Sequence, residues 1–95
     1  MEYLFDLGFS LEEINSLKNK YDNISLEKLE FFPRLVSTNY NYLKSYGIKN
    51  IKVCFINHLK LFFINPDKFR NIFNKYDKND LIRCIEKNDM VLEKL

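Results

Sequence analysis

The chain has 95 residues, enough for one domain and too few for two, because short chains bury a small share of their surface. Hydrophobic residues make up 46% and aromatic residues 16%, which supplies a core and excludes a disordered chain. Two Gly and two Pro are too few for the turns of an all-β fold, so we expect an all-α fold. The net charge of +2 conceals a segregation of charge along the chain.

Targeting and membrane signals are not expected in this sequence. The longest apolar run, residues 59–64, is far shorter than the roughly 20 residues that cross a bilayer. Glu2 and Asp6 interrupt the first apolar stretch, so it lacks the pattern of a secretion signal, and we expect a cytoplasmic protein. The chain contains no Ala, Gln or Trp and is rich in Asn, Lys and Ile, a bias typical of AT-rich bacterial genes and mobile elements.

The first two predicted helices lie on either side of Gly8, which can adopt the left-handed conformation that ends a short helix. Ser10 and Glu13 have the spacing of a capping box, which predicts a helix from residue 11. Phe9 and Ile14 are placed as a hydrophobic staple around that cap. The apolar stripe of this helix is expected to comprise Leu11, Ile14 and Leu17.

A further helix is predicted from an N-cap at Ser25 to a break near Phe32, because Pro33 removes an amide and clashes with the preceding turn. The apolar stripe of this helix is expected to comprise Leu26, Leu29 and Phe32.

The middle of the chain predicts a helix over Tyr40–Tyr46 that stops at Gly47. The next predicted helix, Asn50–Ile64, is apolar on nearly every side, which marks it as the buried centre.

The last third begins with Asn65 and Pro66, an N-cap followed by proline at the first helical position. The stripe of this helix is expected to comprise Phe69, Ile72, Phe73 and Tyr76. Asp77 with Asp80 opens another helix, and Asp89 is expected to cap a last turn. Six to seven short helices result.

An internal repeat is visible at an offset of 39 residues, where Tyr3-Leu4, Gly8, Phe9 and Ile14 correspond to Tyr42-Leu43, Gly47, Ile48 and Val53. The pattern predicts one helical-repeat domain over residues 1–95, with stacked helix-pair units over approximately 1–38 and 39–75 and a partial unit over 76–95. Chance similarity in a biased composition is the alternative explanation.

Several short segments carry a family resemblance: Leu7–Ser10, Tyr46–Lys49, Phe32–Leu35 and Asn65–Phe69. With their Gly, Pro and Leu spacings, they resemble the repeats of the mitochondrial transcription termination factor family. The resemblance implies stacked helical units that form a curved solenoid with a basic groove for nucleic acid.

The charges divide the chain into three parts. Residues 1–30 hold seven acids and three bases, a net charge of −4, and residues 67–95 hold six acids and seven bases, a net charge of +1. Residues 31–66 hold no acid and five bases, a net charge of +5. The basic residues of this middle stretch are Arg34, Lys44, Lys49, Lys52 and Lys60, and it also contains Tyr40, Tyr42 and Tyr46.

Cations mixed with aromatic rings are typical of nucleic-acid surfaces, where rings stack on bases and cations contact phosphates. We therefore expect the eight residues just listed to contact DNA or RNA, with the tyrosines stacking if they are exposed. The alternative is that the lysines only solvate the outer faces of buried helices.

The rival interpretation is a small protein-binding inhibitor from a phage or mobile element, for example of a nuclease or CRISPR effector. The residues expected to face a basic partner are Glu2, Asp6, Glu12 and Glu13. Glu12 and Glu13 also lie where a helix dipole favours negative charge, which explains them without a partner.

Catalysis is not predicted. Cys54 and His58 lie four residues apart and Cys84 is a third potential ligand, but the chain has no second His and no close Cys pair for zinc. Both thiols are expected to be free rather than joined in a disulfide. No glycine-rich phosphate loop or paired-carboxylate motif is present, so we expect no enzyme, no cofactor, no metal and no small-molecule substrate.

Overall fold

Seven α-helices and two 3-10 helices make up the chain, and the computed structural model describes all residues from 1 to 95. No strand is present, which confirms the predicted all-α class. No helix combines the length and the apolar character needed to cross a membrane. The elements are α1 (Tyr3–Asp6), α2 (Leu11–Lys20), α3 (Asn23–Phe31), α4 (Pro33–Tyr46), α5 (Ile51–Asn57), η1 (Leu59–Phe63), α6 (Pro66–Asn74), α7 (Lys78–Lys87) and η2 (Asp89–Lys94).

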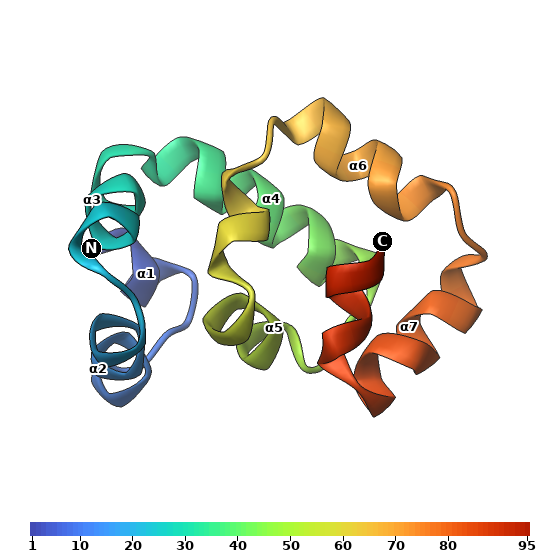
Figure 1. Ribbon diagram of the computed structural model, residues 1–95, viewed down its shortest axis with the longest axis horizontal. Helices are drawn as coiled ribbons and strands as arrows, with labels where there is room; N and C mark the ends of the chain where they lie inside the picture. Colours follow the sequence, from blue (N-terminus) through green and yellow to red (C-terminus); the bar gives the residue numbers. More distant parts are fainter.

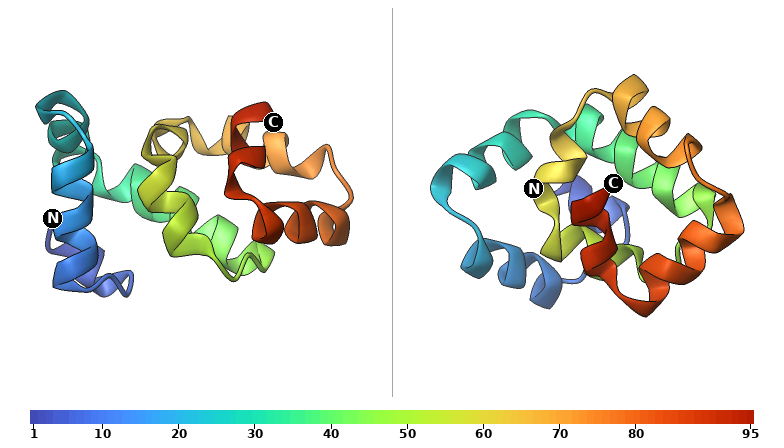
Figure 2. Two further views of the ribbon diagram at one scale, coloured as in Figure 1. Left: turned by 60° about the horizontal axis from the view of Figure 1, so that its bottom comes forward. Right: turned by 45° about the vertical axis from the view of Figure 1, so that its right-hand side comes forward.

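Helix α4 is the longest element, with 14 residues, and it contacts α3, α5, η1 and α6. Helices α1 to α3 form one end of the molecule, and α6 and α7 curve around the other end (Figure 1). The last element, η2, returns from α7 and packs beside α5 (Figure 2). The end of the chain therefore contacts its middle.

The core is one cluster of 20 buried hydrophobic residues. A series of aromatic rings runs through it, each ring within contact of the next. In that series Phe55 contacts Phe62 at a centroid distance of 4.9 Å, and Phe69 contacts Phe73 at 5.0 Å. The whole series comprises Phe9, Tyr40, Phe55, Phe62, Phe69, Phe73, Tyr42 and Tyr46.

Several predicted helix boundaries are confirmed. Ser10 Oγ accepts the Glu13 amide N–H at 3.2 Å, and Glu13 Oε1 accepts the Ser10 amide N–H at 2.8 Å, which forms the capping box. Asn65 caps α6, with Pro66 at its first position, and Asp77 caps α7. Gly8 and Gly47, the residues predicted to end α1 and α4, have φ angles of 100° and 111°.

Two predicted caps were wrong. Asp22, not Ser25, caps α3: its Oδ1 accepts the Ser25 amide N–H at 2.9 Å, and the helix begins three residues earlier than predicted. Asn88, not Asp89, caps η2, through its Oδ1 and the Met90 amide. In both cases the sequence offers two polar candidates within three residues of each other, and either one can serve as an N-cap.

Two predicted helices also have different bounds. The helix predicted over Tyr40–Tyr46 begins at Pro33, because proline occupies its first position, where no amide hydrogen bond is lost. The helix predicted over Asn50–Ile64 is two elements, α5 and η1, separated by His58, which has φ −132° and ψ 44°. The two pieces are still the buried centre of the fold, with Cys54, Phe55, Leu59 and Phe62 fully buried.

Three residues predicted to belong to apolar stripes are exposed. Leu11 is 61% exposed: it is the first residue of α2 and lies about 60° around the helix from Ile14 and about 120° from Leu17, the two residues that α2 buries. Phe32 and Tyr76 are 50% and 42% exposed, since each lies at a junction between helices rather than on a packed face.

Candidate functional site

Arg34 and Lys44 are exposed on the outer side of α4. They are separated by ten residues, which corresponds to about 15 Å along the helix and about 80° around it. Between them the outer side is polar, since Asn41 and Ser45 are exposed as well. Neither Arg34 nor Lys44 forms an ion pair within the molecule.

The other three predicted cations lie outside α4 and do not extend the surface that holds Arg34 and Lys44. Lys52 Nζ lies 3.5 Å from Glu13 Oε1 and 5.9 Å from the centre of the Phe9 ring, so it joins α5 to α2. The Lys49 amide N–H donates to Glu86 Oε2 at 3.1 Å. Lys60 is exposed and lines a pocket on η1. The basic stretch is therefore not one surface.

The predicted stacking tyrosines are mostly part of the core. Tyr40 is 1% exposed and lies between Phe9 and Phe55, with ring centroids 5.3 and 5.6 Å away. Tyr46 is 7% exposed. Burial raises the pKa of both phenols. Neither ring is open to a base, and Tyr42 is the one member of the predicted set that is partly exposed.

Two cations that the sequence did not single out lie beside these tyrosines. The Arg70 guanidinium, from α6, lies 5.8 Å from the centre of the Tyr42 ring, and Lys78 Nζ, at the start of α7, lies 5.1 Å from the Tyr46 ring. Such cation–ring contacts hold the charges in place along α4. A pocket of about 270 Å³ lies here, lined by Tyr42, Ser45, Tyr46, Phe73, Asn74, Tyr76 and Lys78.

No sequence signal could have found Arg70 and Lys78. They belong to residues 67–95, where acids and bases nearly balance, and they reach α4 only because α6 and α7 fold back along it. We define the α4 basic row as Arg34, Lys44, Arg70 and Lys78.

The four acidic residues expected to bind a protein are not equivalent. Glu13 is engaged in the capping box and with Lys52, and the Ser10 amide and then Lys52 hold the pKa of its carboxyl below the usual value. Glu12 is exposed in the first turn of α2, and Glu2 and Asp6 are exposed on α1. Three of the four carboxylates are therefore free.

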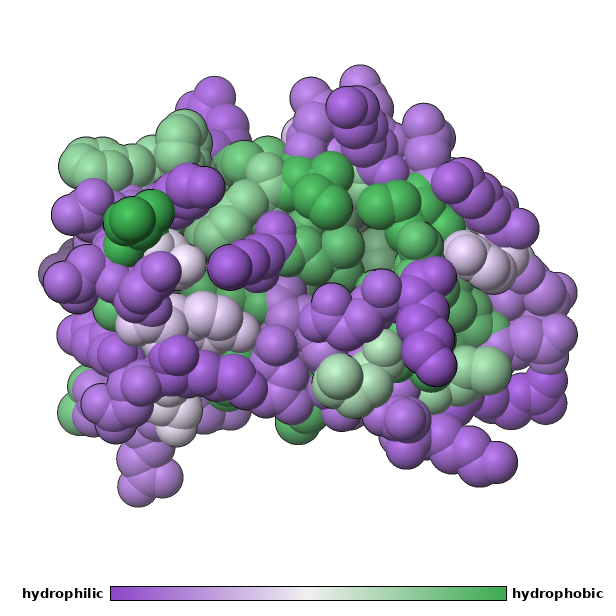
Figure 3. Space-filling model, viewed as in Figure 1, coloured by the Kyte–Doolittle hydropathy of each residue, from purple (hydrophilic) through white to green (hydrophobic).

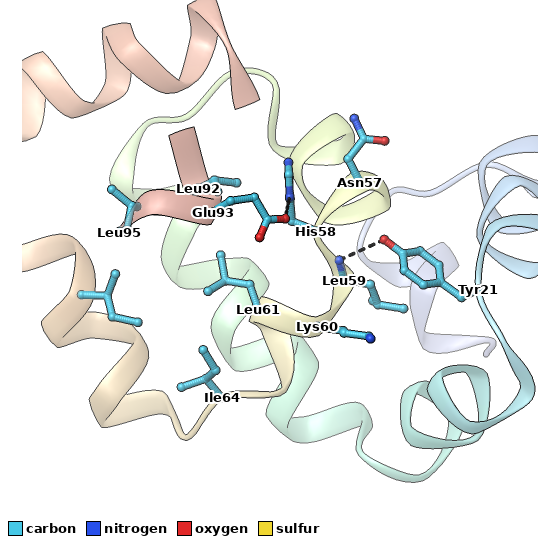
Figure 4. Close-up of a pocket in the computed structure, with 11 residues that line it drawn as sticks. Tyr21, Asn57, His58, Leu59, Lys60, Leu61, Ile64, Leu92, Glu93 and Leu95 are labelled. Atoms are coloured by element: carbon cyan, nitrogen blue, oxygen red, sulfur yellow. Dashed lines mark hydrogen bonds and ion pairs between the residues drawn. The ribbon is translucent and has the colours of Figure 1, made fainter. Parts of the chain in front are cut away.

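A polar cluster surrounds His58, which is buried. Its Nε2 lies 2.8 Å from Asp89 Oδ2. Its Nδ1 lies 2.7 Å from Glu93 Oε1, the contact drawn in Figure 4. Each ring nitrogen therefore lies within hydrogen-bond distance of one carboxylate oxygen. Asn57 also donates to Asp89, and Asn57 and then His58 hold the pKa of Asp89 below its usual value. These bonds fix η2 against α5.

A pocket of about 410 Å³ lies beside this cluster. Figure 4 shows side chains from η1, α6 and η2 around it, with Glu93 directed towards His58. Its apolar lining comprises Leu61, Ile64, Ile72, Leu92 and Leu95, and Lys60 and Tyr21 lie on the other side of η1.

Neither cysteine has the setting of a nucleophile or a ligand. Burial raises the pKa of the Cys54 thiol to about 12, so it stays protonated at neutral pH. Cys84 is exposed on α7, and both thiols are free. No group of three or more His, Cys, Asp or Glu side chains is placed to hold a metal ion.

No protein-family model, curated protein or solved structure matches this chain.

Proposed function

We propose that this protein acts by binding rather than by catalysis, and that it contacts the backbone of DNA or RNA through the α4 basic row. The observation that carries the proposal is that Arg70 and Lys78, from α6 and α7, lie over the Tyr42 and Tyr46 rings of α4, and that neither they nor Arg34 and Lys44 of α4 are paired with a carboxylate. Unpaired cations on a fixed surface release counterions from phosphates when they bind.

The proposed contact is to phosphates and not to bases. The row presents positive charge through Arg34, Lys44 and Lys78 without an element that reads base edges. Phosphate contacts position a protein on nucleic acid but do not select a sequence. Tyr42 is half-buried and Arg70 lies over its ring, so stacking on tyrosine contributes less than the sequence predicted.

The test is a titration of labelled single-stranded and duplex DNA and RNA at several salt concentrations, followed by anisotropy. We expect the logarithm of the binding constant to fall linearly with the logarithm of the salt concentration. The slope should be about −0.9 for each duplex phosphate contacted. Arg70→Gln with Lys78→Gln should lower that slope by about 2, because two contacts are removed.

Lys18→Gln is the matched control, since Lys18 is an exposed cation on α2. It should leave the slope unchanged. If the wild type does not bind at low salt, or if the double variant binds as the wild type does, the proposal is wrong.

The repeated architecture is part of the same proposal. We infer that residues 1–38 and 39–75 are related helical units, like those of the mitochondrial transcription termination factor family, with 76–95 as a partial third. In support, Leu4 and Leu43 are both fully buried, and Gly8 and Gly47 both have positive φ. Ile14 and Val53 differ, because the first is buried and the second is 47% exposed.

Protein binding, including inhibition of a partner, is the second candidate function. It is favoured by two exposed apolar side chains on α3, Ile24 at 67% and Phe31 at 75%, with the exposed Glu27 and Lys28 between them. Ile24 and Phe31 are seven apart and share one face of the helix. Large exposed apolar side chains that lie close together are typical of interaction surfaces.

A further inference from the structure

The pocket of about 270 Å³ beside the α4 basic row lies where the end of α4, the end of α6 and the start of α7 meet. Sites for drug-sized ligands usually occupy about 300–1,000 Å³. This pocket therefore has room for a single planar ring system and not for a larger ligand.

Aromatic rings supply the inner side of the pocket. Tyr42, Tyr46 and Phe73 contact one another, with ring centroids 5.9 to 6.4 Å apart. Phe73 is fully buried and Tyr46 nearly so, which fixes this side in place. Arg70 lies over the Tyr42 ring, so Tyr76, which is 42% exposed, is the lining ring that a planar ligand can reach.

Hydrogen-bond donors lie next to these rings. Asn74 Oδ1 accepts the Tyr42 hydroxyl at 2.9 Å, which holds the Asn74 amide and leaves its N–H groups free to donate. Ser45, on the α4 side of the pocket, is exposed and carries a hydroxyl. An amide and a hydroxyl beside an open aromatic ring can bind the oxygen and nitrogen acceptors of a nucleobase.

The charge at the pocket is positive. Lys78 lines it, and the Arg70 guanidinium lies beside it, 5.8 Å from the centre of the Tyr42 ring. Asp77 precedes Lys78 in the chain but does not line the pocket, and its Oδ2 accepts the Asp80 amide N–H at 3.0 Å as the cap of α7. Figure 3 shows mainly hydrophilic side chains along the outer edge of the molecule at α6 and α7. These surroundings suit a charged ligand better than an apolar one.

From this geometry we propose that the pocket holds one unpaired nucleotide of a single-stranded nucleic acid. The base stacks on the Tyr76 ring and accepts a hydrogen bond from the Asn74 amide, and the adjoining phosphate contacts Lys78. The inference rests on the proposed function, because the strand reaches the pocket along the α4 basic row. The row contacts phosphates alone, and the pocket adds one base to those contacts.

Single strands and duplexes differ in what they can place in this pocket. A base of a single strand is already unpaired, whereas a base of a duplex must first leave its pair and its stack, which costs free energy. Every base has a face that can stack on an aromatic ring. The pocket therefore selects single strands over duplexes without selecting a sequence.

The experiment titrates the whole chain into labelled oligo(dT), oligo(U) and a DNA duplex of equal length at physiological salt, followed by anisotropy. We expect at least one single strand to bind about fivefold more tightly than the duplex, since one stacked base contributes at least that factor. The tighter of the two single strands identifies the polymer that the pocket prefers.

Substitution of Tyr76 separates stacking from charge. Tyr76→Leu removes the ring and should weaken single-strand binding by about fivefold or more, while duplex binding and the salt slope stay unchanged because no cation is lost. Tyr76→Phe keeps the ring and should bind as the wild type does. Phe5→Leu is the matched control, since it replaces an aromatic residue that is 50% exposed on α1. Thermal melting of each variant checks the fold.

Three results would overturn the inference. The duplex could bind as tightly as both single strands, Tyr76→Leu could bind the single strand as the wild type does, or Tyr76→Leu could weaken both polymers equally. If one of these occurs while Arg70→Gln with Lys78→Gln still lowers the salt slope, the phosphate contacts of the α4 basic row stand and the pocket inference alone fails. If neither polymer binds, both proposals fail.

Discussion

Asn39 shows how one polar side chain shapes the surface around it. It is 1% exposed, and its amide group donates to two backbone carbonyls that no helix satisfies. An unpaired buried carbonyl is costly, so the chain from Phe62 to Ile64 stays where Asn39 holds it. On α4 the sequence places Asn39 beside exposed Asn41, and nothing in the local pattern distinguishes the buried amide from the solvated one.

The two cysteines should differ sharply in reactivity. Cys54 is fully buried and its thiol pKa is raised to about 12, whereas Cys84 is exposed on α7. Because the thiolate is the reactive form, a thiol reagent at neutral pH should modify one group in the folded protein and two in denaturant.

Cys84→Ser provides the control for this measurement, since it should remove all rapid reactivity from the folded protein. Two equally fast thiols in the folded wild type would show that α5 is not packed as described.

At the scale of single elements, the start of α3 shows which of two candidate N-cap residues is used, a choice that the sequence alone could not make. Asp22 and Ser25 are both favourable N-cap residues, and the structure assigns the cap to Asp22. The Ser25 amide and hydroxyl hold the pKa of Asp22 below its usual value. Which of the two residues caps α3 depends on how the helix packs to bury Leu29. That packing is a property of the whole molecule and not of the local sequence.

Substitution at this cap should therefore be selective. Asp22→Ala should lower the stability of the protein, because the hydrogen bond that caps α3 is lost. Asp22→Asn should be close to neutral, because an asparagine oxygen accepts the same amide hydrogen bond. Urea unfolding of the three proteins measures the difference, and equal stability of the alanine and asparagine variants would contradict the assignment.

The break at His58 could not be foreseen from residues 50–64. Their apolar pattern favours one continuous helix, and helix formation alone would continue it. The partners that stabilise the break lie far along the chain, at Asp89, Glu93 and Asn39. Local signals thus predicted the capping box and the glycine ends, while contacts over more than 20 residues decided where α5 and η1 separate.

On the scale of the whole molecule, sequence reasoning predicted the helical class and one core but not the full set of cations in the proposed α4 basic row. Arg34 and Lys44 were identified because charge along the chain is visible in the sequence. Arg70 and Lys78 were missed because they join α4 only in three dimensions. Tyr40 and Tyr46 were predicted to contact nucleic acid, but aromatic residues serve cores and binding surfaces alike, and both are core residues here.

The attachment of η2 should make global stability sensitive to acid. Hydrogen bonds from Asn57 and His58 lower the pKa of Asp89 in the folded state, so the unfolded state binds a proton more readily. The resulting stability is present above the unfolded pKa of about 3.9 and is lost as pH falls through the lower folded pKa.

Asp89→Asn removes this titrating group. When the pH is lowered from about 5, above the unfolded pKa of Asp89, to about 2, below it, the free energy of unfolding of the variant should fall less than that of the wild type. Urea unfolding at both pH values gives the comparison. An identical fall in the two proteins would mean that Asp89 does not contribute to acid sensitivity.

The return of η2 to α5 also has a consequence for how the protein is made. A ribosome releases the chain from its amino end, so His58 emerges long before the two carboxylates that enclose it at positions 89 and 93. Until those residues appear, the imidazole and the apolar side chains beside it lack one wall. The nascent chain would then present this surface to chaperones or to neighbouring chains, and synthesis of Glu93 would be the step that closes it.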